Sequence, residues 1–274
     1  MASTVATRQR RGTRLALRAV ALLYVGILVA VPLALIFART FEQGAAEFWD
    51  AVSTPDALHA FRLTGEIALL AVAINTVFGI GVALLLARYR FPGRRLLNVL
   101  LDIPVSVSPI VVGLALVLVY GPSEGWFGPR LSDAGIQVIF ATPGMVLATC
   151  FVSLPLVVRE LVPVLQEEGL DQEVAARSLG ANAWQRFVRI TLPTVRWALA
   201  YGVVLSLARS IGEFGAVRVV SGDVIGQTQT GTLRVADLAE QGEPGAYQVA
   251  LVLVLFAIAC IVGISLLRPS ERKT

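Results

Sequence analysis

Six long apolar runs, separated by short polar segments, constrain the fold of this chain more than any other feature. A helix needs about 20 mainly apolar residues to cross the hydrocarbon core of a bilayer, and each run is close to that length. With 56% hydrophobic and 15% charged residues, the composition also excludes an ordinary soluble globular protein. We therefore predict an all-α bundle of six transmembrane helices that forms one membrane domain over residues 1–274. The predicted spans lie at about residues 19–37, 63–87, 100–120, 139–158, 196–220 and 246–267.

The distribution of arginine indicates how these helices are oriented. Cytoplasmic loops of membrane proteins carry an excess of Lys and Arg. With both chain ends inside, the cytoplasmic segments hold 17 of the 23 Arg and Lys residues, and the opposite orientation would invert this asymmetry. We therefore expect a multi-pass protein of the cytoplasmic (inner) membrane with both termini in the cytoplasm. The polar segment of about residues 159–195 then also lies in the cytoplasm.

Several chemistries are excluded because the residues they need are missing. Lys273 is the only lysine, so the chain has no G-x-x-x-x-G-K-[ST] phosphate loop and cannot hydrolyse ATP by that route. His59 is the only histidine, which excludes Ser-His triads and histidine-based zinc sites. Cys150 and Cys260 both lie in apolar runs and make neither a disulfide framework nor a metal set. We predict no catalytic residue, no metal, no cofactor and, because the charges form no single patch, no nucleic-acid partner.

The segment Glu173–Pro193, EVAARSLGANAWQRFVRITLP, carries clear helix-boundary signals. Gly180 follows a helix-favouring stretch and suits the left-handed position just after a helix. Asn182 can cap a second helix, with Gln185 as the reciprocal partner of a capping box. We expect Pro193 to interrupt the backbone before the next membrane run. The prediction is a short helix, a glycine-fixed bend and a second helix at the membrane face.

Two features of the first of these helices bear on how it is used. Glu173 and Arg177 are four residues apart in the favourable order for a surface ion pair. Ala175 and Ala176 have almost no side chain, so another protein could approach the backbone closely.

The same residues resemble the loop motif of importer-type ABC transporter permeases: Glu-Ala-Ala, three residues, Gly, nine residues, Ile, one residue, Leu-Pro. The departure is at the acid, because Val174 precedes the alanines and Glu173 comes one residue early, a Glu-x-Ala-Ala variant. In that family the segment is a coupling helix that docks in a cleft of the ATPase subunit. The alternative is an ordinary cytoplasmic helical hairpin. The resemblance assigns ATPase coupling to Glu173, Ala175, Ala176, Gly180, Ile190, Leu192 and Pro193.

A second polar cluster lies in the fifth predicted span. Arg209 and Glu213 are four residues apart and can neutralise one another, which a charge at membrane depth requires. One interpretation is that this stretch lines or gates an anion path, and the other is a structural ion pair that holds helices together. Ser210 belongs to the same stretch, and Ser106 and Ser108 in the third span are weaker candidates for the path, since membrane serines usually bond their own backbone.

From about Leu63 onward, the chain resembles sulfate/thiosulfate ABC permeases of the W type. The resemblance rests on DIPVSVSPIVVGLAL, TPGMVLATCFVSLPLVVREL, the coupling motif and, most specifically, GEFGAVRVVSG at residues 212–222. Molybdate permeases share the core at residues 210–216, and the Val-Val-Ser-Gly continuation favours sulfate. Gly231 and Thr232 stand where the family usually has Leu-Pro, so the external loop is expected to differ in shape.

The resemblance implies a MetI-like importer fold and a complex. Its expected partners are two ATP-binding ABC subunits, a second (T-type) permease or a second copy of this chain, an external sulfate-binding protein and membrane lipid. The permease itself would perform no chemistry. The alternatives are a molybdate or tungstate ABC permease, an ATP-independent anion transporter, for which no inverted repeat is found, and an intramembrane enzyme, which the missing histidines and metal ligands disfavour.

Overall fold

A computed structural model describes residues 11–267, with side chains for residues 15–265. All regular structure in this range is helical, in agreement with the predicted all-α class. The elements are α1 (Arg11–Val25), the π-helical turn η1 (Gly26–Ala30), α2 (Val31–Thr40), α3 (Ala45–Val52), α4 (Pro55–Arg88), α5 (Arg94–Ser106), α6 (Pro109–Tyr120), α7 (Gly128–Asp133), α8 (Thr142–Glu167), α9 (Asp171–Ser178), α10 (Ala183–Arg186), the π-helical turn η2 (Phe187–Thr191), α11 (Leu192–Ile211), α12 (Gly215–Ser221), α13 (Gly231–Glu240) and α14 (Gly245–Leu267).

Five helical segments are long and apolar enough to cross a membrane, and the bent pair α5–α6 makes a sixth if it counts as one span. The five lie at Leu15–Thr40, Pro55–Arg88, Thr142–Glu167, Ala183–Ile211 and Gly245–Ser265. The chain therefore passes through the membrane several times. Arg8, Arg10, Arg268, Arg272 and Lys273, which contribute to the predicted orientation, lie outside the described residues.

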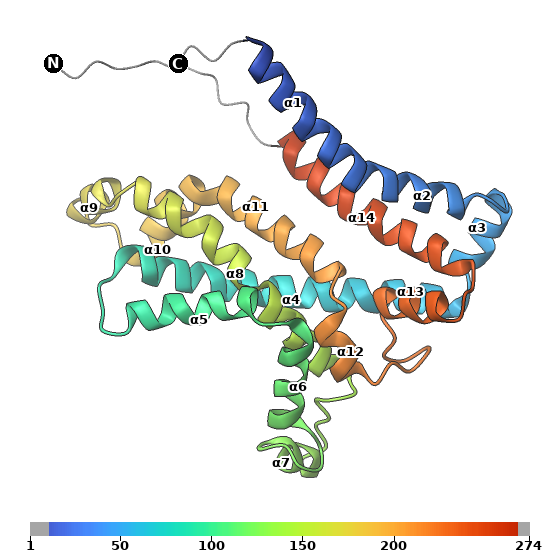
Figure 1. Cartoon of the computed structure of the whole chain (residues 1–274). Helices are drawn as coiled ribbons and strands as arrows, with labels where there is room; N and C mark the ends of the chain where they lie inside the picture. The colour runs from blue at the N-terminus through green and yellow to red at the C-terminus, as the bar shows by residue number, and fades with distance from the viewer. Residues whose placement is uncertain (1–10, 268–274) are drawn as a thin grey trace.

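The 34-residue helix α4 is the central element and packs on α8 and α11 (Figure 1). The three helices come closest at Val157 of α8. A Cβ on Gly79 of α4 would lie 2.9 Å from Val157 Cγ1, and a Cβ on Gly202 of α11 would lie 3.1 Å from Val157 Cα. Small residues let membrane helices approach in this way, so dispersion contacts stabilise the bundle where lipid offers no hydrophobic driving force.

Figure 1 shows three further features of the arrangement. The continuous helix α1–η1–α2 lies along α14 and away from the central helices. Helices α9 and α10 lie at one end of the bundle, and α3 and α13 lie at the other. Helix α6 projects away from the bundle and packs on α12.

The third predicted span is not one straight helix. Helix α5 ends at Ser106, α6 begins at Pro109, and the helix axis bends by 113° between them. Pro109 has no N–H to continue the ladder, and it forces Ser108 into an extended conformation with ψ of 134°. The bend therefore divides the predicted third span into two helices.

The fifth predicted span, at about 196–220, is wrong as a continuous helix. Helix α11 ends at Ile211, and α12 begins only at Gly215. Glu213 between them is therefore not on the helix that carries Arg209. One backbone carbonyl in the break, that of Glu213, is hydrogen-bonded to another helix: it accepts the Thr232 hydroxyl of α13 at 2.8 Å.

At Pro193 the helix continues, contrary to the predicted interruption. The helical segment runs from Ala183 to Ile211, with the π-helical turn η2 just before the proline. In that turn the Leu192 N–H donates to the carbonyl of Phe187, five residues earlier. The wider turn gives room to a proline ring, which would collide with the carbonyl four residues before it in a regular helix.

Smaller differences concern the segments between the spans. Helix α4 begins at Pro55, eight residues before the predicted second span, because Thr54 caps it by accepting the Ala57 N–H at 3.2 Å. The fourth span continues to Glu167, so Arg159 is inside a helix instead of in a loop. The three segments expected to be external loops contain the short helices α3, α7 and α13.

Candidate functional site

The bend between α9 and α10 is built as the sequence predicts. Gly180 has φ of +85°, a left-handed conformation that costs a non-glycine residue about 1–2 kcal/mol. Its N–H donates to the carbonyl of Arg177 at 3.0 Å, and the Ala181 N–H donates to that of Ala176 at 3.0 Å. These two bonds form a Schellman motif, which satisfies the last carbonyls of α9.

The second helix of the bend is capped reciprocally. The Gln185 N–H donates to Asn182 Oδ1 at 2.9 Å, and the Asn182 N–H donates to Gln185 Oε1 at 3.0 Å. This is the predicted capping box. Trp184 and Phe187 then stack with ring centroids 5.7 Å apart, so α10 and η2 form a rigid unit.

Glu173 does not pair with Arg177 as predicted. Its Oε1 lies 2.9 Å from Nη2 of Arg88, at the end of α4, and accepts the Thr191 hydroxyl at 3.1 Å. The two charged side chains are only 11% (Arg88) and 20% (Glu173) exposed. A partly buried partner strengthens an ion pair, which explains why it wins over a solvated surface pair.

Arg88 also holds the end of α8. Its Nη1 donates to the carbonyl of Leu165 at 2.9 Å and to that of Gly169. One guanidinium thus joins the ends of α4 and α8 to α9, which fixes where the α9–α10 bend stands relative to the bundle. We call these residues, Arg88, Glu173 and Thr191, the Arg88 cluster.

The outer face of the bend is apolar and exposed. Leu179 is 89% exposed, and the side chains of Val174 and Trp184 are also exposed. Ala175 is exposed beside them. Next to this face, a hollow of about 670 Å³ is bounded by residues that include Tyr89, Trp184 and Arg88. Such a surface on a polar, capped helix pair suits contact with another protein.

The remaining residues predicted for coupling lie where the segment enters the membrane helix. Ile190 and Thr191 are in η2, and Leu192 and Pro193 begin α11. Thr191 is buried and Ile190 partly buried, so they hold the segment onto the bundle and do not form its outer face.

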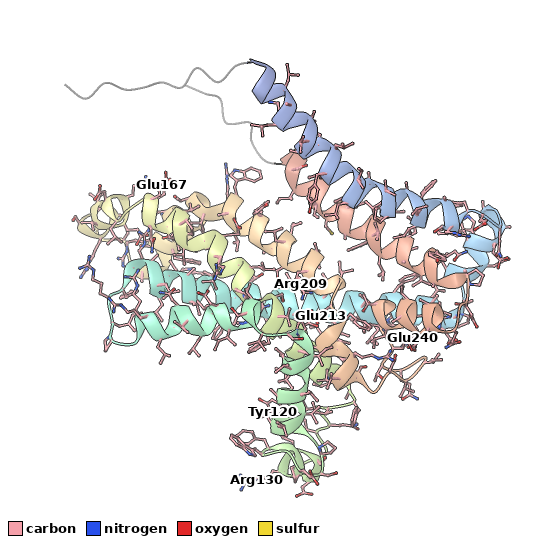
Figure 2. All side chains as sticks on the ribbon, viewed as in Figure 1. Tyr120, Arg130, Glu167, Arg209, Glu213 and Glu240 are labelled. Atoms are coloured by element: carbon pink, nitrogen blue, oxygen red, sulfur yellow. The ribbon has the colours of Figure 1, made fainter. Side chains whose placement is uncertain are left out.

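The Arg209–Glu213 pair forms as predicted, across the break between α11 and α12. Arg209 Nη1 lies 2.7 Å from Glu213 Oε2 (Figure 2). The carboxylate is 2% exposed and the arginine side chain 40%. Glu213 Oε1 also accepts the Ala216 N–H at 3.0 Å, so the buried acid is held in place while the guanidinium reaches an open surface.

The serines predicted for a path have unlike surroundings. Ser210 is buried and donates to Ser153 Oγ at 3.3 Å, and Ser153 accepts Asn75 Nδ2 at 2.9 Å. Ser210 therefore belongs to a polar contact that joins α4, α8 and α11. Ser106 and Ser108 are exposed at the bend between α5 and α6.

Sequence reasoning missed two contacts that the fold creates. Arg88 is one of four arginines close together in the sequence, at positions 88, 90, 94 and 95, and no local signal separates it from the others. Arg159 and Asp102, assigned to a loop and to the start of a span, form an ion pair between α8 and α5. Within the described residues, no group of three or more His, Cys, Asp or Glu could hold a metal ion.

Residues 76–273 match the family described as binding-protein-dependent transport system inner membrane component. This chain belongs to that family. The permease is 49% identical over 244 residues to the sulfate transport system permease protein CysW of Escherichia coli K12, covering 86% of this chain and 83% of that protein. It is 36% identical over 248 residues to CysT of the same organism, covering 90% and 89%. The higher identity to CysW confirms the predicted W-type resemblance.

Two further similarities extend this result. Sulfate permease 2, chloroplastic, of Chlamydomonas reinhardtii is 48% identical over 243 residues, which cover 88% of the permease but 66% of that longer protein. Among solved structures, a bacterial ABC transporter involved in the import of the acidic polysaccharide alginate matches with a TM-score of 0.76 at 17% identity, covering 94% of this chain and 95% of that one. The latter match confirms the predicted importer-type fold.

Proposed function

We propose that this chain is a membrane-spanning subunit of an ATP-driven importer that carries sulfate or thiosulfate across the cytoplasmic membrane. The observation that carries the proposal is the 46–49% identity to proteins named as sulfate transport permeases, over most of their length for the CysW proteins. The lower identity to CysT suggests that a T-type permease is the second membrane subunit, in preference to a second copy of this chain.

The exposed α9–α10 bend is the proposed contact with the ATPase. Its apolar side chains, Val174, Leu179 and Trp184, would enter a cleft of an ATP-binding subunit, one such subunit serving each permease. When the two ATPases close on ATP, the bend would be pulled with them. The Arg88 cluster would pass that movement to α4 and α8, because it ties the bend to both helices. Hydrolysis would take place on the ATPases alone.

The proposed orientation places α9 and α10 and both chain ends in the cytoplasm. The other end of the bundle, with α3 and α13, would then meet an external sulfate-binding protein. A related alginate importer was solved in complex with an alginate-bound periplasmic protein, and such an arrangement would suit this end of the permease.

Arg209 is the proposed contact for the anion on the outer side of the path. Its side chain is 40% exposed, while its counter-ion is buried and held by a backbone N–H. The positive charge can therefore face an aqueous path that forms between two permeases. Ser106 and Ser108 are proposed to line the same path at the bend, and Ser210 is proposed to support it through Ser153.

The test is uptake of radiolabelled sulfate by proteoliposomes that contain the permease, its sister permease and ATPase, with the binding protein added outside. We expect uptake that requires both ATP inside and binding protein outside, and competition by thiosulfate. Competition by molybdate but not thiosulfate would instead support the molybdate alternative. Uptake that persists without ATP would reject an ABC importer.

A further inference from the structure

Helix α5 has a polar stripe along one side. Asn98, Asp102 and Ser106 follow one another at four-residue spacing, so their side chains stand above one another on a helix, and all three are exposed. The other two sides of α5 are apolar. Leu97, Leu101 and Pro104 face the core, where Leu101 and Pro104 are buried, whereas Leu96, Val99, Leu100 and Ile103 form an exposed apolar side.

Arg159 of α8 lies beside this stripe. Its guanidinium donates to Oδ1 of Asp102, and each of the two side chains is 55% exposed. Between residues 148 and 162 of α8, Arg159 is the one exposed residue among those described. The other residues of this stretch are buried or partly buried, so Arg159 is the point at which α8 presents an exposed side chain, next to α5.

The pair lies about two turns in from the end of each helix. At 1.5 Å per residue, Asp102 is roughly 12 Å from the start of α5, and Arg159 is roughly 12 Å from the end of α8. Ser106 is roughly 18 Å from the start of α5, where the helix bends away. An arginine at the centre of a bilayer costs at least about 2.5 kcal/mol when it faces lipid, so a half-exposed ion pair here must face water or protein.

We propose that Asn98, Asp102, Ser106 and Arg159 line the half of the anion path that leads to the α9 end of the bundle. This inference rests on the function proposed above. Arg159 is the cation that a tetrahedral oxyanion meets after it passes the bend at Ser106. Asn98 and Ser106 make the wall polar on either side: each donates to a carbonyl of its own helix, at 3.2 Å and 3.1 Å, and Asn98 keeps a second amide N–H for the anion. Asp102 stays bound to Arg159 and weakens its attraction for the anion, so that the anion leaves instead of being held.

Sealing against the second permease is the competing explanation, and accessibility separates it from a path. The experiment uses the complete complex in inside-out vesicles, with Cys150 and Cys260 replaced by alanine. Asn98→Cys and Ser106→Cys probe the stripe, and Val99→Cys and Ile103→Cys, on the apolar side of α5, are the matched controls. A negatively charged, membrane-impermeant methanethiosulfonate is added with and without sulfate.

We expect the two stripe cysteines to react at least about 10-fold faster than the controls, and sulfate to slow them during ATP turnover. Stripe cysteines that react no faster than Val99→Cys would overturn the proposal, because the stripe would then be covered by lipid or by the second permease. Vesicles of the alanine-substituted parent are assayed for ATP-driven sulfate transport in parallel. Transport by the parent together with unreactive stripe cysteines would reject this path alone, whereas a parent that moves no sulfate would reject the proposed function.

A charge test gives an independent result. In the neutral pair Asp102→Asn with Arg159→Gln, the two side chains keep a hydrogen bond but lose the cation. We expect transport to fall at least about 10-fold in a complex that still assembles, and Arg159→Lys to retain most transport. Transport at the parental rate in the neutral pair would show that the contact is only structural and would overturn the role of Arg159.

Discussion

Arg88 Nη2 and Glu173 Oε1 lie 2.9 Å apart, although the two residues are 85 positions apart in the chain. The contact joins the end of the longest helix to the first turn of α9, which carries the exposed apolar face of the bend. Arg88 also bonds two carbonyls near the end of α8, so one side chain joins α4, α8 and α9 at this corner.

Replacing Arg88 should therefore strongly reduce both the stability of the protein and its transport activity. In Arg88→Gln, Glu173 keeps only Thr191 as a partner, and breaking a buried pair in this way costs about 3 kcal/mol. We expect a lower melting temperature in detergent and loss of ATP-coupled uptake. Arg90→Gln, at an exposed arginine two residues on, is the control and should resemble the parent. Arg88→Lys should rescue poorly, since an ammonium cannot reproduce the planar fork of donors. Equal melting temperatures for the Arg88 and Arg90 variants would contradict this role.

A substitution at Gly180 tests the backbone conformation of the bend, because a side chain there does not crowd neighbouring atoms. A Cβ at this position meets no atom within 4 Å, so the whole effect of Gly180→Val comes from its φ of +85°. We expect a cost of about 1–2 kcal/mol, confined to the bend, and uptake uncoupled from ATPase activity in a bundle that remains folded. Gly180→Asn should be milder, because asparagine tolerates the left-handed region. Gly81→Ala in α4, equally open but helical, is the matched control. Normal coupled uptake by Gly180→Val would argue against docking at the bend.

Arg209 and Arg218 can be compared directly. We expect Arg209→Ala to reduce anion uptake about 10-fold or more, because it removes the proposed contact between the guanidinium and the anion. A 10-fold change in rate corresponds to about 1.4 kcal/mol. Arg218 instead binds Asp223 at 2.7 Å and Asp237 at 2.8 Å, which ties α12 to α13, so Arg218→Ala should mainly lower stability. The double variant Arg209→Gln with Glu213→Gln separates the two interpretations. Full uptake by this variant would show that the pair only holds helices together.

The loop after α12 should respond to pH. Burial raises the pKa of the Asp223 carboxyl, and the nearby Asp237 raises it further, against the opposing effect of Gln229 and Arg218. A raised pKa in the folded state means that this group's contribution to stability is fully present below its unfolded pKa. That contribution is lost as the pH rises through the folded pKa.

We therefore expect Asp223→Asn to flatten the pH dependence of the melting temperature at pH values above the ordinary aspartate pKa of 3.8. Asparagine suits the position, where φ is +52°. Asp133→Asn, at the exposed end of α7, is the control. An unchanged pH profile for Asp223→Asn would assign the dependence to other groups.

The proposed orientation can be tested with one engineered thiol. Ala183→Cys, exposed at the start of α10, leaves the capping box in place. It should react with an impermeant reagent only when the cytoplasmic face is open. Labelling from outside intact cells would refute both the orientation and the contact with an ATPase.

Local signals in the sequence were sufficient for the α9–α10 bend. Gly180, Asn182 and Gln185 act on their own backbone within a few residues, so their spacing predicts their bonds. The pairing of Glu173 with Arg177 failed for the complementary reason. A local surface pair is worth a few tenths of a kcal/mol, and a partner brought from α4 by the fold outweighs it.

The two breaks in the membrane helices show a second limit. Hydropathy alone does not reveal that the run through Gly212, Glu213 and Phe214 leaves the helix, because the flanking residues on both sides are apolar. What stabilises the break is the hydroxyl of Thr232 in another helix, a contact that no local pattern contains. The bend before Pro109 was partly foreseeable, since proline restricts the residue before it, but its angle depends on how α6 packs on α12.

Helix α4 holds a contact near each end. Thr64 accepts the Gly231 N–H of α13 at 2.8 Å, and 24 residues later Arg88 holds Glu173. The two contacts are about 36 Å apart along the continuous helix α4. If α4 rotates about Thr64 by only about 5°, Arg88 at its other end moves by about 3 Å, which is about the donor–acceptor distance of a hydrogen bond. If a substrate-bound binding protein docks on one side of the membrane, rotation of α4 as a rigid body would thus be enough to move the residues that face the ATPase on the other side. No series of side-chain rearrangements between the two ends would be needed.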